Sequence, residues 1–307
     1  MARSDGVTAR FWQCLVLGHL SLAATLAGLL AILERLPGRE AVLIAFAAFL
    51  AFPALFLVIS FSISLACTRG DTSPLISRIA LALRALLIES VQLPRAIAAM
   101  IVAPRSAASQ TLGAGAALRP VMLIHGILSN HAIWKPWFGR LQAAGFAPVH
   151  AIDLEPFLGD LDSHAASVIE ELRALQRRCR GARIAIIAHS RGGLVARGAL
   201  DALGPAVISQ VITIGSPHHG SAIARLFPGA AAHEVRPDSP WLCAMRAREA
   251  LGPSVPFTSI YSMQDNLVVP ARTALLHGAR VIELKGLGHL SLMGCRSSIE
   301  RAIGALS

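Results

Sequence analysis

A serine flanked by small residues stands between an apolar run and a helical pattern. The run Ile186–Ala188 is apolar, Ser190 follows closely, and Gly192 precedes a helical pattern that continues to Leu203. Small-x-Ser-x-Gly in this setting is typical of a sharp turn from strand to helix, which lifts the serine hydroxyl above the sheet edge. Free N–H groups at the helix start favour a developing negative charge there. The pattern therefore predicts nucleophilic chemistry at Ser190.

A serine nucleophile needs a base, and the base needs a carboxylate that orients it. In proteins with this turn, the acid follows the serine along the chain and the histidine comes last. Among the later acids only Asp265 lies just beyond a predicted strand, because the others fall inside helices, inside a strand or in 216–253. His289 follows the last predicted strand, whereas His277 precedes it and should lie at the opposite end. The sequence thus predicts the catalytic set Ser190, His289 and Asp265.

Acyl chemistry at a serine also needs two N–H donors for the oxyanion. One donor is expected from the backbone of Arg191, which directly follows the nucleophile. The other is expected from Ile127, in the loop after the first predicted strand. The His125 side chain is expected to hold that loop by a hydrogen bond. For the Arg191 side chain two possibilities stay open: it alters substrate preference, or it packs outward.

The chain that carries these residues alternates short apolar runs with helical patterns from Arg119 onward. Such alternation predicts an α/β fold with a mainly parallel sheet flanked by helices. Strands are predicted at 121–124, 147–154, 184–188, 211–214, 257–261 and 280–284, and helices at about 161–179, 191–203 and 290–305. Because the candidate residues follow the ends of strands, we expect them to meet at one edge of the sheet.

Two long uncharged runs come first, from Phe11 to Leu33 and from Ala41 to Cys67. The chain is 54% hydrophobic and only 15% charged, whereas a soluble domain carries about 25% charged residues. Since about 20 apolar residues cross a bilayer as a helix, both runs qualify as spans. A cleaved signal peptide has a shorter apolar core, and here a second run follows at once. We therefore favour an uncleaved transmembrane hairpin with spans at about 11–33 and 41–67.

Basic residues flank this hairpin on its outer sides. Arg3 and Arg10 precede the first run, and the arginines after the second run are Arg69, Arg78, Arg84, Arg95 and Arg105. The positive-inside rule then predicts that both ends lie in the cytoplasm. We expect a multi-pass protein of the cell (inner) membrane with a cytoplasmic catalytic region. The five cysteines are scattered and odd in number, which also favours a reducing compartment.

Residues 74–95 form a third helical pattern, whose polar residues fall within one arc of roughly 140°. They are Ser77, Arg78, Arg84, Glu89, Gln92 and Arg95. Two interpretations stay open: a helix that lies in the membrane surface, and an amphipathic helix packed on the next domain. Residues 104–118 are interpreted as a linker. The predicted organisation is a hairpin in 1–70, an amphipathic helix and linker in 71–118, and a catalytic domain in 119–307.

Taken together, the motifs resemble those of α/β-hydrolases, and more narrowly those of bacterial triacylglycerol lipases. The stretches that carry the resemblance are His125-Gly126 with Ser129-Asn130 and Trp134, Ala188–Gly193, Ser216–Ser221, Asp265 with Val268 and Pro270, and Gly288-His289. They cover most of 119–307 and none of 1–110. The resemblance implies an acyl-serine intermediate that water then hydrolyses. The sequence departs from the family at Ala188, which replaces a glycine, and at Arg191, where the family often has an uncharged residue.

Several features of this region concern ligands. His218 and His219 are interpreted as scaffold, with a metal role as the alternative. The segment 218–256 is either a cap over an acyl site or a set of surface loops with one helix. The sequence has no nucleotide loop, metal-ligand cluster or calcium cage, so we expect no cofactor. With a net charge of +10 and no nucleic-acid-binding motif, anionic lipid head groups are the expected partner rather than nucleic acid.

The resemblance and the apolar runs together imply a membrane-anchored serine hydrolase that cleaves carboxylic esters of lipids at the bilayer surface. Acyl transfer or thioester cleavage by the same three residues is the alternative, because only the acceptor or the leaving group differs. A non-catalytic hydrolase fold that serves as a tethered interaction module ranks below both. All three candidate catalytic residues are present in the sequence, which argues against that module.

Overall fold

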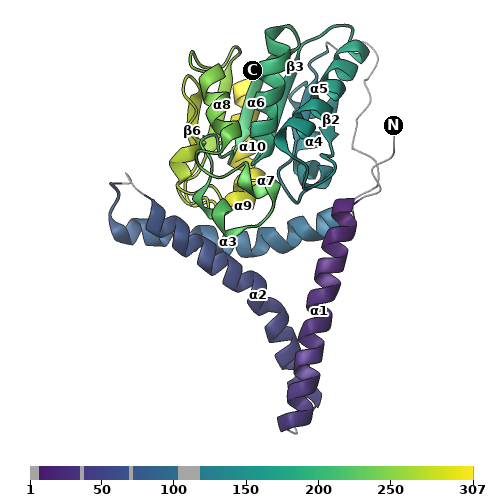
Figure 1. The fold of residues 1–307 in the computed structure, drawn as a ribbon, viewed down its shortest axis with the longest axis vertical. Helices are drawn as coiled ribbons and strands as arrows, with labels where there is room; N and C mark the ends of the chain where they lie inside the picture. Colours follow the sequence, from purple (N-terminus) through teal and green to yellow (C-terminus); the bar gives the residue numbers. More distant parts are fainter. Residues whose placement is uncertain (1–6, 35–37, 69–71, 103–117, 307) are drawn as a thin grey trace.

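The computed structural model describes residues 7–34, 38–68, 72–102 and 118–306 of the chain. Helices α1 (Val7–Glu34) and α2 (Gly38–Cys67) come first, and α3 (Leu75–Ile101) follows them. In Figure 1, α3 lies along one side of the sheet region, and α1 and α2 extend away from its two ends and converge. The expected link between the two spans falls partly on residues 35–37, and most of the expected linker lies at 103–117, both outside the described residues.

Helices α1 and α2 each contain a stretch that is long and apolar enough to cross a membrane. These stretches are Val7–Leu29 and Arg39–Cys67. Only 12% and 6% of the residues in their most apolar windows are buried, so they do not form a soluble core. Both helices are therefore candidate membrane spans by length, composition and exposure.

Helix α3 is longer than predicted and continues through Pro94 to Ile101. Its large apolar side chains Ile76, Ile79, Leu83, Leu87 and Val91 recur every three or four residues, so they share one face, and all are exposed. The buried residues of α3, by contrast, are Ala85, Glu89 and Met100. One face of α3 thus packs on the sheet region while an apolar face points away from it. The interpretation of 74–95 as a helix packed on the next domain describes the buried face. The interpretation as a helix in the membrane surface describes the exposed apolar face.

The following region is built on a six-stranded sheet in which all neighbouring strands are parallel. The strand order is β2-β1-β3-β4-β5-β6. The strands are β1 (Val121–Ile124), β2 (Val149–Ile152), β3 (Ile184–His189), β4 (Ile208–Ile214), β5 (Phe257–Tyr261) and β6 (Arg280–Glu283). This confirms the predicted fold class, because continuous apolar runs are the pattern of strands covered on both faces. The second strand is shorter than predicted, and the fourth begins three residues earlier.

Helices cover both faces of this sheet (Figure 1). One core contains side chains of α5 (Leu161–Arg178) and α6 (Gly192–Leu203). The opposite core contains side chains of α4 (Lys135–Ala143) and α10 (Arg296–Leu306). The shorter elements are η1 (His131–Trp134), η2 (Gly204–Ala206), η3 (Ala222–Leu226), α7 (Ala230–His233), α8 (Pro240–Arg248), η4 (Ala271–Ala274) and α9 (His289–Gly294). Helix α4 was not predicted, and the single helix expected at 290–305 is two helices that are separated at Cys295.

Candidate active site

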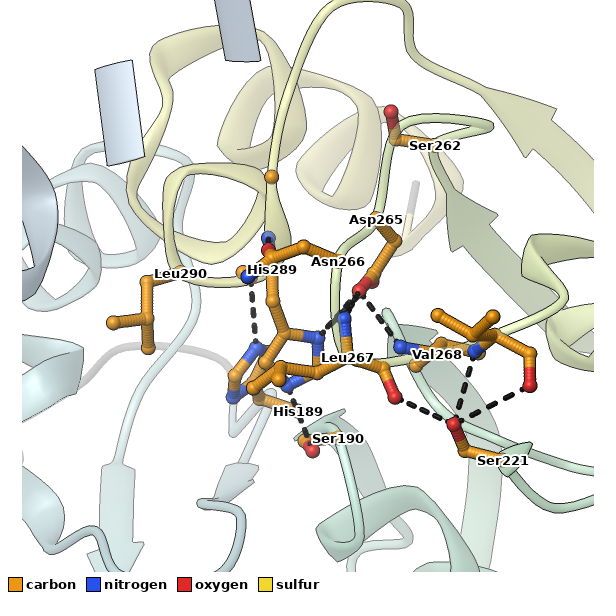
Figure 2. Close-up of polar contacts among 12 residues, drawn as sticks. His189, Ser190, Ser221, Ser262, Asp265, Asn266, Leu267, Val268, His289 and Leu290 are labelled. Atoms are coloured by element: carbon orange, nitrogen blue, oxygen red, sulfur yellow. Dashed lines mark hydrogen bonds and ion pairs between the residues drawn. The ribbon is translucent and has the colours of Figure 1, made fainter. Parts of the chain in front are cut away.

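The chain segments after β3, β5 and β6 bring Ser190, Asp265 and His289 together (Figure 2). The hydroxyl oxygen of Ser190 lies 2.9 Å from Nε2 of His289. Nδ1 of His289 lies 3.0 and 3.1 Å from the two carboxylate oxygens of Asp265. At these distances an imidazole can take the serine proton while the carboxylate fixes its tautomer. His277, the other candidate histidine, is exposed just before β6.

Ser190 occupies a strained turn between β3 and α6. Its φ angle is +56°, a left-handed conformation that costs a residue other than glycine about 1–3 kcal/mol. A Cβ on Gly192 would collide with the carbonyl oxygens of His125 and Ile124. A Cβ on Gly126 would lie 2.8 Å from Cβ of Ser190. Glycine at these positions therefore lets the loop after β1 approach the serine closely.

Two backbone N–H groups beside this serine are free to bind an anion. Among the described residues, neither the Ile127 nor the Arg191 N–H donates to an acceptor within the protein. The imidazole of His125 supports the same loop, with Nδ1 2.7 Å from the Gly126 carbonyl oxygen and Nε2 accepting the N–H of Leu154. Burial lowers the pKa of His125, so its ring is neutral and can serve both contacts.

The Arg191 guanidinium does not pack outward, which corrects one of the two expectations for it. The residue is 2% exposed. Its nitrogens lie 2.8 Å from Nδ1 of His164, 2.7 Å from the carbonyl oxygen of Gly159 and 2.8 Å from the carboxylate of Glu234. Arg191 thus joins the start of α5 to the segment 218–256, while its backbone stays beside Ser190.

The Asp265 carboxylate is oriented from several sides. One of its oxygens accepts the N–H groups of Leu267 and Val268, each at 2.9 Å. The side-chain oxygen of Asn266 accepts the N–H of His289 at 3.0 Å. The loop after β5 therefore holds both the ring and the backbone of the histidine (Figure 2).

Charged and titratable groups surround the His289 ring. Burial alone lowers the pKa of His289, but the charge of Asp265, their hydrogen bond and the Glu89 carboxylate raise it above the ordinary value. His189 packs against the ring with centroids 4.7 Å apart. Burial lowers the pKa of His189 well below its ordinary value, so this neighbour is neutral. The raised pKa of His289 suits a base that must hold a proton during acyl transfer.

The Ser216–Ser221 block packs under the turn. A Cβ on Gly193 would collide with the hydroxyl of Ser216. Nε2 of His218 lies 2.9 Å from the hydroxyl of Thr213, and burial lowers the pKa of His218 well below its ordinary value. In the described part of the chain no three potential metal ligands cluster, so these contacts favour the scaffold role over the metal alternative.

The segment 218–256 divides into two parts. Helix α8 belongs to the main body, because its Leu242 and Met245 are buried. The earlier part exposes Leu226 and Phe227, and the Phe227 ring lies 6.4 Å from the ring of Phe56 in α2. The cap interpretation is therefore confined to this earlier part, which lies next to a candidate span.

Sequence analysis missed four residues that hold the loops of the site. They are Trp12 in α1, Ser60 and Ser64 in α2, and Glu89 in α3. Glu89 carried a usable signal, because it is the only acidic residue of a helix whose other charged residues are arginines. The serines and the tryptophan carried no such signal within apolar runs.

Comparisons with known proteins show what the chain is similar to. A family model described as palmitoyl protein thioesterase matches residues 120–269, which include Ser190 and Asp265. Triacylglycerol lipases of Burkholderia plantarii and Pseudarthrobacter phenanthrenivorans are each 32% identical, over 135 and 115 residues. The matches cover 41% and 34% of this chain and 36% and 35% of those lipases. The chain thus spans about a third of the length of these curated relatives.

Solved structures resemble a larger share of the chain. The mature lipase BlEst2 of Bacillus licheniformis superposes with a TM-score of 0.57 at 18% identity, covering 67% of this chain and 99% of that one. The chain has the α/β-hydrolase fold. Lipase B of Aspergillus fumigatus gives the same TM-score at 20% identity, covering 64% of this chain and 55% of that chain. These findings confirm the predicted fold and the resemblance to bacterial lipases.

Proposed function

We propose that this α/β-hydrolase is a membrane-anchored serine hydrolase that cleaves carboxylic esters of lipids. The observation that carries the proposal is the unbroken hydrogen-bonded chain from Ser190 through His289 to Asp265, with distances of 2.9 and 3.0 Å. A serine beside an oriented imidazole is the arrangement used for acyl transfer. The lipase relatives support an ester as the substrate class.

In the proposed reaction, Nε2 of His289 takes the proton of Ser190 as its oxygen attacks the ester carbonyl carbon. The N–H groups of Ile127 and Arg191 stabilise the oxyanion. The intermediate collapses, the alcohol leaves with the proton from His289, and an acyl-serine remains. Water then loses a proton to His289 as its oxygen attacks the acyl carbon. When this second intermediate collapses, the carboxylic acid leaves and His289 returns the proton to the Ser190 oxygen. Throughout, Asp265 stabilises the imidazolium and keeps its charge.

The N-terminal helices support a lipid as the source of the ester. Both α1 and α2 are long enough to span a bilayer. The exposed apolar face of α3, which includes Ile76, Leu83 and Leu87, suits the interface between head groups and acyl chains. The opposite face of α3 contacts the segment that begins with His289. We infer that the site lies at the bilayer surface, on the cytoplasmic side that the flanking arginines favour.

Thioester cleavage is a second candidate, favoured by the palmitoyl protein thioesterase match over residues 120–269. The catalytic steps would be the same, except that the leaving group is a thiol in place of an alcohol. Because a thiolate needs less protonation to leave, ester and thioester turnover would respond differently to impaired His289.

Both candidates are tested on the full-length protein in detergent micelles, with p-nitrophenyl palmitate and palmitoyl-coenzyme A as matched substrates. We expect hydrolysis of the p-nitrophenyl ester and labelling by a fluorophosphonate probe, both abolished in Ser190→Ala. Turnover confined to the thioester would favour the second candidate. Folded protein that hydrolyses neither substrate and takes no label, or activity that survives in Ser190→Ala, would contradict the proposed function.

A further inference from the structure

Three N-terminal helices each contact a different loop of the candidate active site. The indole N–H of Trp12 in α1 donates to the carbonyl oxygen of Leu128, one residue after Ile127, at 2.7 Å. The hydroxyl of Ser64 in α2 donates to the backbone carbonyl oxygen of Asp265 at 2.8 Å. The carboxylate of Glu89 in α3 contacts the segment that follows His289. Each helix therefore contacts a different loop: α1 the loop of Ile127, α2 the loop of Asp265 (the acid loop), and α3 the loop of His289.

The Glu89 contact is made to the start of α9. One carboxylate oxygen accepts the N–H of Leu290 at 2.7 Å, and the other accepts the N–H of Ser291 at 2.9 Å. Because α9 begins at His289, these N–H groups belong to its first turn, which has no intrahelical acceptors. A carboxylate there binds both donors and is favoured by the helix dipole. Glu89 is 2% exposed, so this contact is shielded from water.

Gly286 and Gly288, on either side of Leu287, allow α2 and α3 to pack closely against this loop. A Cβ on Gly288 would lie 2.8 Å from the Glu89 carboxylate and 2.9 Å from the ring of Phe61 in α2. A Cβ on Gly286, whose φ is +67°, would lie 3.0 Å from the side chain of Arg84. Both helices thus pack directly against the loop that carries His289.

Helix α2 bonds to the loop that carries Asp265. Besides the bond from Ser64, the side-chain amide of Asn266 donates to the hydroxyl of Ser60 at 3.0 Å. The oxygen of the same amide accepts the N–H of His289. A continuous set of hydrogen bonds therefore runs from α2 through Asn266 to the histidine.

We propose that the N-terminal helices complete the active site as well as anchor it, with Glu89 as a positioning residue for His289. The inference rests on the proposed function, because positioning has a consequence only if His289 is the base. Helices that lie in the bilayer would then set the geometry of the catalytic loops, and disturbing their packing would lower turnover.

Glu89 also acts on the ring through its charge. The groups that face His289 are Asp265 from the loop after β5, His189 from β3 and Glu89 from α3. Burial raises the pKa of Glu89 above its ordinary value, although the two N–H bonds and the nearby imidazole favour the charged form and offset part of this rise. Its charged form helps to hold the pKa of His289 above the ordinary value. Removing that charge without changing the size of the side chain should lower the pKa of His289.

The central test is Glu89→Gln in the full-length protein in micelles, with p-nitrophenyl palmitate as substrate. The glutamine side chain has one oxygen, which can accept the N–H of either Leu290 or Ser291. Its NH₂ group then faces the remaining N–H, so that donor loses its acceptor. Since a misplacement of about 1 Å can cost about 10²-fold in rate, we expect kcat to fall about 10- to 10²-fold with KM little changed. The acidic limb of the kcat/KM profile should move to lower pH. Glu300→Gln, the same change on the exposed face of α10, should leave both readouts as in the wild type.

An independent set of variants tests α2. Ser60→Ala and Ser64→Ala remove the two bonds to the acid loop, whereas Ser62→Ala changes an exposed serine of the same helix. We expect kcat to fall several-fold in the first two variants and to stay unchanged in the third. These variants keep the inference testable if Glu89→Gln fails to fold, which thermal unfolding would reveal.

The outcomes separate this inference from the proposed function. Activity that persists in Ser190→Ala would overturn the proposed function itself. If Ser190→Ala is inactive while Glu89→Gln matches Glu300→Gln, the helices do not position the site. A lower kcat in Glu89→Gln with an unmoved acidic limb would also overturn the inference, because the effect would not then act through His289.

Discussion

The indole N–H of Trp12 donates to the carbonyl oxygen of Leu128 at 2.7 Å, across 116 positions of the sequence. Leu128 has a φ of +55° and directly follows Ile127, the candidate oxyanion donor. The contact therefore ties the first candidate span to the loop where negative charge would develop. It is a direct link between a candidate membrane span and the chemistry that we propose.

Trp12→Phe removes this bond but keeps an aromatic ring. A hydrogen bond contributes about 0.5–1.5 kcal/mol, so kcat should fall about two- to tenfold while KM changes little. Steady-state kinetics on a p-nitrophenyl ester measure the effect. Trp241→Phe is the matched control, because the Trp241 indole bonds to Asp162 on an exposed surface. Equal kinetics for the two variants would refute a role for Trp12 at the site.

Asp265→Asn should lower kcat by about 10⁴-fold while substrate binding stays nearly unchanged. The amide can no longer hold the neutral tautomer of His289 or stabilise its charged form. A loss of about 10⁴-fold in kcat is typical when the carboxylate of such a triad is replaced by an amide. Single-turnover kinetics with a long-chain ester separate chemistry from binding. Asp238→Asn, which alters an exposed carboxylate, should keep wild-type rates. A loss of less than tenfold at Asp265 would point to a different acid.

The pH dependence of kcat/KM should have an acidic limb above about 6.5, the ordinary pKa of a histidine. Burial lowers the pKa of His289, but Asp265 and Glu89 raise it further, so the net direction is upward. The ring must be neutral to take the proton of Ser190, and activity is therefore lost as the pH falls through the raised pKa. A profile of the full-length protein in micelles gives the value. A limb at or below the ordinary pKa would contradict the geometry around His289.

Gly288→Ala should lower both kcat and the thermal unfolding temperature. The added Cβ would lie 2.8 Å from the Glu89 carboxylate and 2.9 Å from the ring of Phe61, so α2 and α3 must move away from the loop. Gly304→Ala makes the same change in α10, where no heavy atom lies within 4 Å of the new Cβ. That control should gain up to about 1 kcal/mol of stability from helix propensity. Unchanged activity in Gly288→Ala would show that the packing of α2 and α3 on this loop is unimportant.

The strands of the sheet were predictable because buried parallel strands are short apolar runs that stand out in a sequence. The run 257–261 has the predicted bounds, and the glycine after Ser190 marked the turn. Helix α4 was missed because Lys135–Ala143 mixes charged, aromatic and glycine residues without a long apolar period. An element could therefore be predicted where its apolar residues follow a clear period, and was missed where they do not.

The contacts of Glu89 and Arg191 could not be predicted, for a different reason. A helical pattern locates a polar arc but not the surface that the arc faces. Glu89 meets its partner Leu290 across 201 positions of the sequence, so only the docking of α3 reveals the bond. The same reason applies to Arg191. Its partner Glu234 lies 43 residues away, in a segment whose structure the sequence pattern did not predict.

The central claim is that Ser190 forms an acyl intermediate, and trapping that intermediate tests it most directly. Full-length protein turning over p-nitrophenyl palmitate is quenched in acid, digested and examined by peptide mass spectrometry, with Ser190→Ala in parallel. The account predicts a palmitoyl adduct on the peptide that contains Ser190, removed by hydroxylamine and missing from the variant. An adduct on another residue, or ester consumption by Ser190→Ala at the wild-type rate, would contradict it.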